Sequence, residues 1–234
     1  MNLTDLEQQY RFTYPALYKR LERDGMLDVG QYGPQWRDTV LPRLKQRPTL
    51  LLHSADFELL NVDAVATELA ALKDPDDYRN IKPEYTFIPF GQSGSGDLYC
   101  LLLTGNANGE QMPVVLLAHD LNEATYLAKN LSDYIFRTLL TDLSEQDTYN
   151  GQRDEEFRDN LTRVFQTHLQ YLSEAQAATL QEKLAGNIID YDVALRKGRT
   201  EKRRGLLTNT KRDALLQQLI PFDNMGRTFE YSAD

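Results

Sequence analysis

The chain has 234 residues, 41% hydrophobic and 26% charged, so it is long and apolar enough to bury a core. Its formal net charge of −9 disfavours general binding to nucleic-acid phosphates, and its single cysteine excludes an internal disulfide framework. No apolar run reaches the roughly 20 residues of a membrane span, and the first residues lack the pattern of a signal peptide. We therefore expect a cytoplasmic protein with neither a membrane nor a nucleic acid as direct partner.

The negative charge is concentrated in the middle of the chain. Residues 50–148 carry a net charge of −11. Residues 1–49 carry a net charge of +2, and the charges of residues 149–234 sum to zero. A partner that recognises charge is therefore expected to contact the middle region.

The first sixty residues predict helices, a connection and two strands. Apolar spacing predicts helices near residues 3–10 and 15–25, and the proline-rich stretch 30–48 predicts a connection with short helical pieces at most. The apolar runs at residues 49–53 and 57–60 predict two short strands around a polar turn.

The middle region predicts a sheet between two helices. The first helix is expected at residues 62–72, and a second, with apolar residues every four positions, at residues 123–140. Between them, strands are expected within residues 84–118, joined by turns too short for crossover helices, which favours an antiparallel meander. Gly96, in the first turn, is expected to adopt a conformation that a β-carbon disfavours.

The chain thus predicts an α+β domain over residues 1–148, with an antiparallel β-meander packed by helices, and a mainly helical C-terminal extension over residues 149–234. In the extension, apolar stripes predict helices at 157–172 and 173–184, and residues 188–195 predict a strand. The basic run at 196–212 is interpreted as a solvated linker or helix face; alternatively, its charges fold the tail back onto the acidic middle region.

No motif in the sequence indicates catalysis. His53, His119 and His168 have no second histidine or cysteine at metal-ligand spacing, and Cys100 sits in an apolar strand. The segment GQSGSGD lacks the lysine of a phosphate-binding loop and precedes a strand, so its glycines are interpreted as turn residues. The acidic loop at residues 73–83 lacks the glycine and distal glutamate of an EF-hand. We therefore expect that the protein is not an enzyme and that it has neither a cofactor nor a metal site.

Three segments carry a family resemblance. They are YPALYKRLERDGML, then FIPFGQSGSGDLYCL, then PVVLLAHD followed by LAKNLSDYIFRTLL. Together, over about residues 10–142, they resemble the SUKH superfamily, named partly after a yeast cell-wall-synthesis regulator. The stretch 28–48 is longer and richer in proline than the family pattern, and the tail after Tyr149 has no counterpart in it.

The resemblance implies a binding function. Many bacterial members of this superfamily are immunity proteins that neutralise a polymorphic or contact-delivered toxin, and eukaryotic relatives are interaction modules. The lead hypothesis is therefore an immunity protein whose partner is a cognate toxin domain, basic if that toxin acts on nucleic acids. An interaction module without a toxin partner and a small-molecule binder or enzyme are the alternatives. The candidate partner-binding residues are Asp74, Asp76, Asp77, Ser95, Asp97, Tyr99, Asp120 and Glu123.

Overall fold

The computed structural model describes residues 1–31, 33–105, 111–195 and 198–233. The helices are α1 (Leu3–Tyr10), α2 (Ala16–Arg23), α3 (Trp36–Thr39), α4 (Leu41–Gln46), α5 (Val62–Lys73), α6 (Leu131–Asp142), α7 (Asp154–His168), the 3₁₀ helix η2 (Leu169–Tyr171), α8 (Glu174–Leu184) and α9 (Asn209–Leu219). The strands are β1 (Glu58–Leu59), β2 (Tyr85–Gln92), β3 (Leu98–Thr104), β4 (Val114–Leu117), β5 (Ala124–Ala128), β6 (Ile189–Ala194), β7 (Thr200–Gly205) and β8 (Thr228–Phe229).

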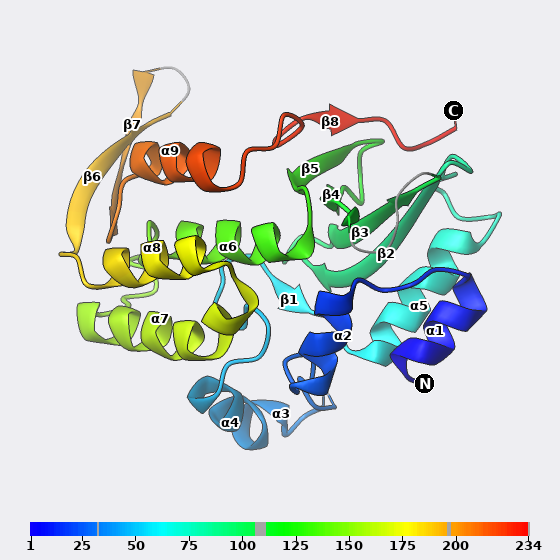
Figure 1. Cartoon of the computed structure of the whole chain (residues 1–234), viewed down its shortest axis with the longest axis horizontal. Coiled ribbons are helices and arrows are strands. Elements are labelled where there is room, and N and C mark those ends of the chain that lie inside the picture. Colours follow the sequence, from blue (N-terminus) through cyan, green and yellow to red (C-terminus); the bar gives the residue numbers. More distant parts are fainter. Residues whose placement is uncertain (32, 106–110, 196–197, 234) are drawn as a thin grey trace.

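One sheet organises the molecule (Figure 1). Its order is β1-β2-β3-β4-β5-β8, and every pairing in it is antiparallel. The expected α+β class and the antiparallel meander over residues 84–118 are confirmed. The last strand, β8, comes from the C-terminal tail and pairs with β5, so the tail extends the sheet that the middle region builds.

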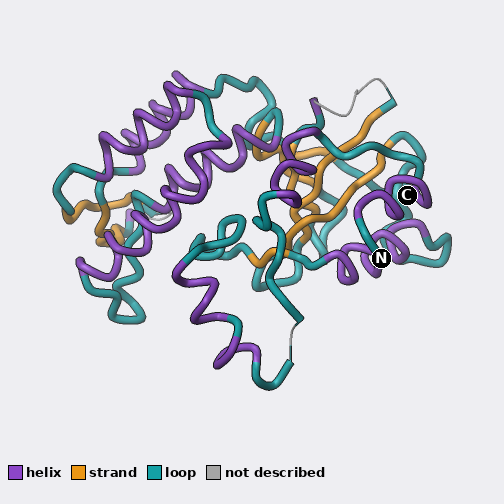
Figure 2. The backbone as a smooth tube through the Cα atoms, turned by 60° about the horizontal axis from the view of Figure 1, so that its bottom comes forward, coloured by secondary structure: helices purple, strands orange, loops and turns teal. Residues whose placement is uncertain are grey.

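Helices and the C-terminal tail pack around the sheet. On one face, Tyr85 and Phe87 of β2 pack against Phe229 of β8, with ring centroids 5.2 and 6.5 Å apart. On the other, Phe90 and Tyr99 pack against Tyr134 of α6, with ring centroids 5.7 and 5.8 Å apart. Beyond α6 lie α7 and α8, and the hairpin β6–β7 stands at the end of the molecule far from the two termini (Figures 1 and 2). No helix among the described residues has the length and apolar character needed to cross a bilayer.

The β2–β3 hairpin forms as its glycine pattern predicts. Ser93 N–H donates to the Asp97 carbonyl at 2.8 Å, and Gly96 N–H donates to the Ser93 carbonyl at 3.1 Å. Gly96 has φ +97°, which confirms its expected conformation. Gly91 is required for a different reason, because a Cβ there would lie 2.4 Å from Cε2 of Phe57.

Two expected elements are wrong. Residues 49–53 form a buried turn and not a strand, and Leu51 has φ +54°. Residues 123–140 form the strand β5 followed by the helix α6, because Asn130 caps the helix and accepts a hydrogen bond from Asp133 N–H at 2.9 Å. The leucine spacing that predicted one helix therefore spans two elements.

The basic run also differs from its first interpretation. Residues 200–205 form β7, which pairs with β6. Arg203 contacts Glu145 at 2.6 Å, while Arg204 contacts Asp154 at 2.7 Å and Asp190 at 2.9 Å. The second interpretation therefore holds for Arg203, which pairs with the acidic middle region; Arg204 pairs with carboxylates of the tail.

Candidate functional site

The expected partner-binding residues lie in three connections and one strand. Asp74, Asp76 and Asp77 follow α5, Ser95 and Asp97 form the β2–β3 turn, and Asp120 and Glu123 lie between β4 and β5. The β2–β3 turn and the β4–β5 loop share one end of the sheet, because Leu98 pairs with Leu117 across the antiparallel ladder. Tyr99 lies inside β3.

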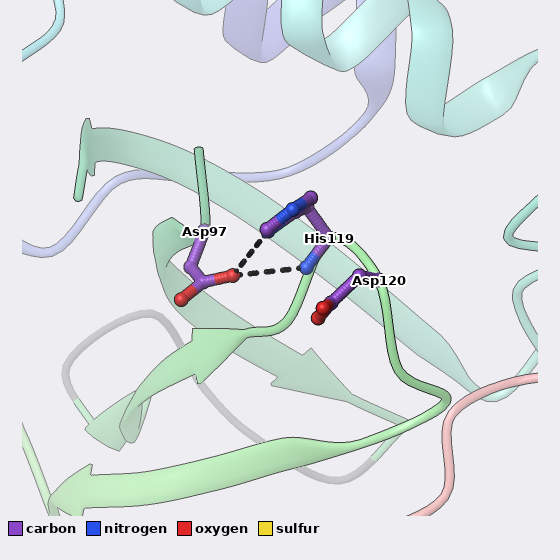
Figure 3. Close-up of side chains that lie close together, drawn as sticks. All are labelled: Asp97, His119 and Asp120. Carbon is purple, nitrogen blue, oxygen red and sulfur yellow. Dashed lines mark hydrogen bonds and ion pairs between the residues drawn. The ribbon is translucent and has the colours of Figure 1, made fainter. Parts of the chain in front are cut away.

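His119 joins two of these connections (Figure 3). Its backbone N–H donates to Oδ1 of Asp97 at 3.0 Å, and its imidazole Nδ1–H donates to the same oxygen at 2.7 Å. Partial burial raises the pKa of Asp97, but the hydrogen bonds from His119 and Ser95 outweigh it, so this pKa lies below its ordinary value. The same hydrogen bond raises the pKa of His119. The hydrogen bond therefore favours the protonated form of His119 and the ionised form of Asp97.

Asp97, His119 and Asp120 also have the residue types of a metal site. Their ligand atoms lie within 4.8 Å of one another. Oδ1 of Asp97 already accepts hydrogen bonds from both the backbone N–H and the ring of His119. We therefore interpret the cluster as a hydrogen-bonded Asp97–His119 pair with a neighbouring carboxylate.

Tyr78 links the acidic loop to this end of the sheet. Its hydroxyl donates to the His119 carbonyl at 2.8 Å, although 72% of the side chain is exposed. From the tail, the Tyr231 hydroxyl lies 3.2 Å from the Ala118 carbonyl and 3.0 Å from the Leu121 carbonyl. These contacts fix three connections, far apart in sequence, as one surface.

The candidate residues separate into two groups on this surface. Asp77 is occupied by Arg79, whose Nε and Nη2 donate to its two oxygens at 2.7 and 2.8 Å, and Asp97 is occupied by His119. By contrast, four exposed carboxylates form no ion pair with a lysine or arginine of the described residues, although Asp120 lies near the His119 ring. We call these the acidic rim: Asp74, Asp76, Asp120 and Glu123.

Ser95 and Tyr99 have mainly internal contacts. The Ser95 hydroxyl lies 2.8 Å from that of Ser93 and 3.2 Å from Asp97 Oδ2. Tyr99 is 9% exposed, its hydroxyl donates to the Asp56 carbonyl at 3.0 Å, and burial raises its pKa to about 12. The structure thus places Tyr99 under the surface, on the α6 side of the sheet.

The residues with intrinsic reactivity are buried and serve the fold. Cys100 is fully buried, and burial raises the pKa of its thiol well above the ordinary value, which opposes a nucleophilic role. His168 is also fully buried, and its Nε2 accepts a hydrogen bond from Leu51 N–H at 3.0 Å. Both agree with the structural roles expected from the sequence.

Sequence reasoning missed a cleft of about 500 Å³. It lies between the sheet and two helices, with Leu116 of β4, Arg137 of α6 and Leu216 of α9 among its lining residues. One sequence signal could have indicated it. Arg137, Thr138 and Thr141 interrupt the apolar side of α6 three, four and seven residues after Tyr134, at the spacing of one helix face.

The comparisons with known proteins bear on the first part of the chain. A family model described as SMI1 / KNR4 family (SUKH-1) matches residues 2–137, which is more than half of the chain. No curated protein and no solved structure matches the chain. The matched segment contains α1 to α5, the strands β1 to β5 and the first half of α6.

Proposed function

The chain belongs to the SMI1/KNR4 family (SUKH-1), and we propose that it is an immunity protein. In this proposal it binds a cognate toxin domain, polymorphic or contact-delivered, and neutralises it by protein–protein interaction, without catalysis. The acidic rim supplies the charged contacts.

The unpaired state of the acidic rim carries this proposal. Asp74, Asp76, Asp120 and Glu123 are exposed, and no lysine or arginine of the described residues forms an ion pair with them; His119 is the basic side chain near Asp120. Toxin domains that act on nucleic acids need basic surfaces, since they must hold phosphate. Carboxylates opposite such a surface raise the association rate through long-range attraction and favour the correct orientation.

The internal contacts support the same function by limiting motion. The bidentate pair of Asp77 with Arg79, the Asp97–His119 pair and the Tyr78 hydrogen bond hold the loops that carry the rim. A surface ordered before binding loses less conformational entropy when the partner docks.

The decisive experiment is co-expression with the toxin domain that this proposal expects to be encoded directly upstream of the gene. The wild-type protein should protect cells, and a variant with all four rim carboxylates changed to lysine should protect less. A control variant reverses four exposed acidic residues elsewhere and has the same net charge: Asp38, Glu155, Asp192 and Asp223. If the rim variant folds and protects as well as the control, the rim is not the binding surface.

An interaction module without a toxin partner remains the second candidate. Its distinguishing feature is the gene neighbourhood, because an immunity gene is expected directly downstream of a large toxin gene. If no toxin gene lies there and no neighbouring product is toxic, the immunity proposal fails while the fold assignment stands.

A further inference from the structure

The missed cleft has walls from three parts of the chain. Tyr99 and Leu116 come from the sheet, Tyr134 and Arg137 from α6, and Leu216 from α9 of the tail. The tail helix α9 packs beside α6 (Figure 1). Its residues Arg212, Asp213 and Leu216 line the cleft. A volume of about 500 Å³ lies in the range of small-ligand sites.

Half of the lining residues are apolar or aromatic, and the acidic groups among the others already have partners. Asp142 accepts a hydrogen bond from the Ser54 hydroxyl at 2.5 Å, and Glu145 contacts Arg203 at 2.6 Å. Asp213 contacts Arg212 at 2.9 Å, and Asp56 accepts a hydrogen bond from Gly94 N–H at 2.8 Å.

Arg137 is the exception in this lining. Among the described residues, none makes a hydrogen bond, an ion pair or a ring contact with its guanidinium. Burial lowers the pKa of Arg137, and its neighbour Arg212 lowers it further. Asp213 favours the charged form of Arg137, but no hydrogen bond or ion pair joins the two side chains, and that carboxylate is bonded to Arg212. A partly desolvated guanidinium without an anion destabilises the free protein, so an anion that enters the cleft gains a ready partner.

We propose that this cleft binds a ligand that carries one carboxylate on an aromatic or apolar body, with Arg137 pairing with the carboxylate. The fork of a guanidinium matches the two oxygens of a carboxylate. The body lies against Tyr99, Tyr134 and Leu216. Glu145 and Asp213 near the same wall disfavour the double charge of a phosphate. The ligand is either a free small acid or an acidic side chain next to an aromatic one in a partner protein. This proposal does not depend on the immunity function.

Methionine methyl groups provide a direct test. The chain has four methionines, and Met225 lines the cleft, whereas Met26 and Met112 are buried at 3% and 1% exposure and do not line it. In protein labelled with ¹³C at the methionine methyls, phenylacetate is titrated into the millimolar range expected for so small a ligand. The Met225 signal, assigned with Met225→Leu, should shift and saturate, while the Met26 and Met112 signals stay fixed.

Two comparisons isolate the carboxylate–Arg137 pair. Phenylacetamide, which has the same shape without the charge, should bind at least about tenfold more weakly than phenylacetate. Arg137→Met should weaken phenylacetate binding by a similar factor, whereas Arg163→Met, a partly exposed arginine of α7 outside the cleft, should not. Because Arg137→Met removes an unpaired buried charge, the free variant should unfold at an equal or higher urea concentration.

The outcomes decide the proposal and the source of the ligand. If Met225 does not respond, or if phenylacetamide binds as well as phenylacetate in the wild type, the proposal is wrong whether or not the Arg137 variant folds. Phenyl phosphate binding more tightly than phenylacetate would also overturn it. Given phenylacetate binding, the capped dipeptide N-acetyl-Phe-Glu-amide distinguishes the sources: tighter binding of the dipeptide indicates a protein partner, and weaker binding indicates a free acid.

Discussion

Two glycines beside the β2–β3 turn are needed for different physical reasons. At Gly91, beside an irregularity in the β2–β3 ladder, φ is not in the positive range, but a Cβ would lie 2.4 Å from Cε2 of Phe57 and 3.1 Å from the Glu58 carbonyl. At Gly96 the space is open, with the nearest atom 3.9 Å away, but φ is +97°. The sequence predicted the conformation of Gly96 because turns follow local rules. It could not predict the close approach at Gly91, which depends on the distant side chain of Phe57.

We expect both Gly91→Ala and Gly96→Ala to destabilise the protein. Overpacking against Phe57 should cost about 1–3 kcal/mol at Gly91, and the strained backbone should cost about 1–2 kcal/mol at Gly96. Urea unfolding measures both, with Gly33→Ala as the control, since no atom lies within 4 Å of a Cβ there. If Gly91→Ala is as stable as the control, the overpacking against Phe57 is disproved. If Gly96→Ala is as stable as the control, the backbone strain is disproved.

The buried carboxyl of Asp142 should make stability depend on pH. Burial raises its pKa from 3.8 to about 7. The folded protein therefore holds this proton more tightly than the unfolded chain does. The stabilisation is complete below about pH 4 and is lost as the pH rises through 7. His168 acts in the opposite direction, because burial lowers its pKa to about 4, so acidification below 6.5 costs stability.

Asp142→Asn isolates the first effect. The free energy of unfolding of the wild type minus that of Asp142→Asn should fall as the pH rises from 4.5 to 7.5, measured by urea unfolding at each pH. Asp38→Asn, which makes the same chemical change at an exposed residue, serves as the control variant. A constant difference for Asp142→Asn would mean that Asp142 ionises normally in the folded protein.

At the scale of elements, local signals identified those whose partners are near in sequence. The β2–β3 hairpin and the capping box of Ser173 and Gln176 in α8 are examples. The turn at residues 49–53 was misread because its support is distant: His168, 117 residues away, accepts the Leu51 N–H hydrogen bond. Similarly, β5 pairs with β8 of the tail, and no local pattern of residues 124–128 contains that information.

The corrected boundary between β5 and α6 leads to a test of packing. Leu131, the first residue of α6, is 2% exposed, so Leu131→Ala should cost about 2–5 kcal/mol of unfolding free energy. Leu121, in the loop before β5, is 58% exposed and serves as the matched control. Chemical denaturation compares the two variants. Equal, small losses would contradict the placement of α6 on the sheet.

For the whole molecule, the main question is how independent the tail is. The expected boundary at residue 148 stays a prediction. Contacts cross it throughout: Gln176 Nε2 donates to the buried Asp133 at 3.0 Å, Leu206 N–H donates to the Leu143 carbonyl at 2.7 Å, and β8 pairs with β5. Buried residues of both parts belong to one hydrophobic cluster. The sequence could not show this, because most of these contacts join residues more than forty positions apart.

Truncation tests that organisation. A chain ending at residue 148 lacks α8 and α9, which pack on α6. It therefore exposes the apolar residues of α6 that face these helices, and it should lose cooperative unfolding or melt far below the full chain. A chain ending at residue 226 loses only β8 and the last residues, so it should show an intermediate loss. Thermal melts followed by circular dichroism measure both. If residues 1–148 melt like the full chain, the tail is a separate module.

The candidate surface was predictable in part. The sequence identified the acidic loops, but not which carboxylates are paired; Arg79 and His119 decide that in the folded protein. The most direct test is the association rate with the upstream-encoded toxin domain, at low and at physiological salt. The rim variant should associate more slowly than both the wild type and the control variant of equal charge, and its rate should depend less on salt. Equal rates and equal salt dependence for the rim and control variants would contradict the account.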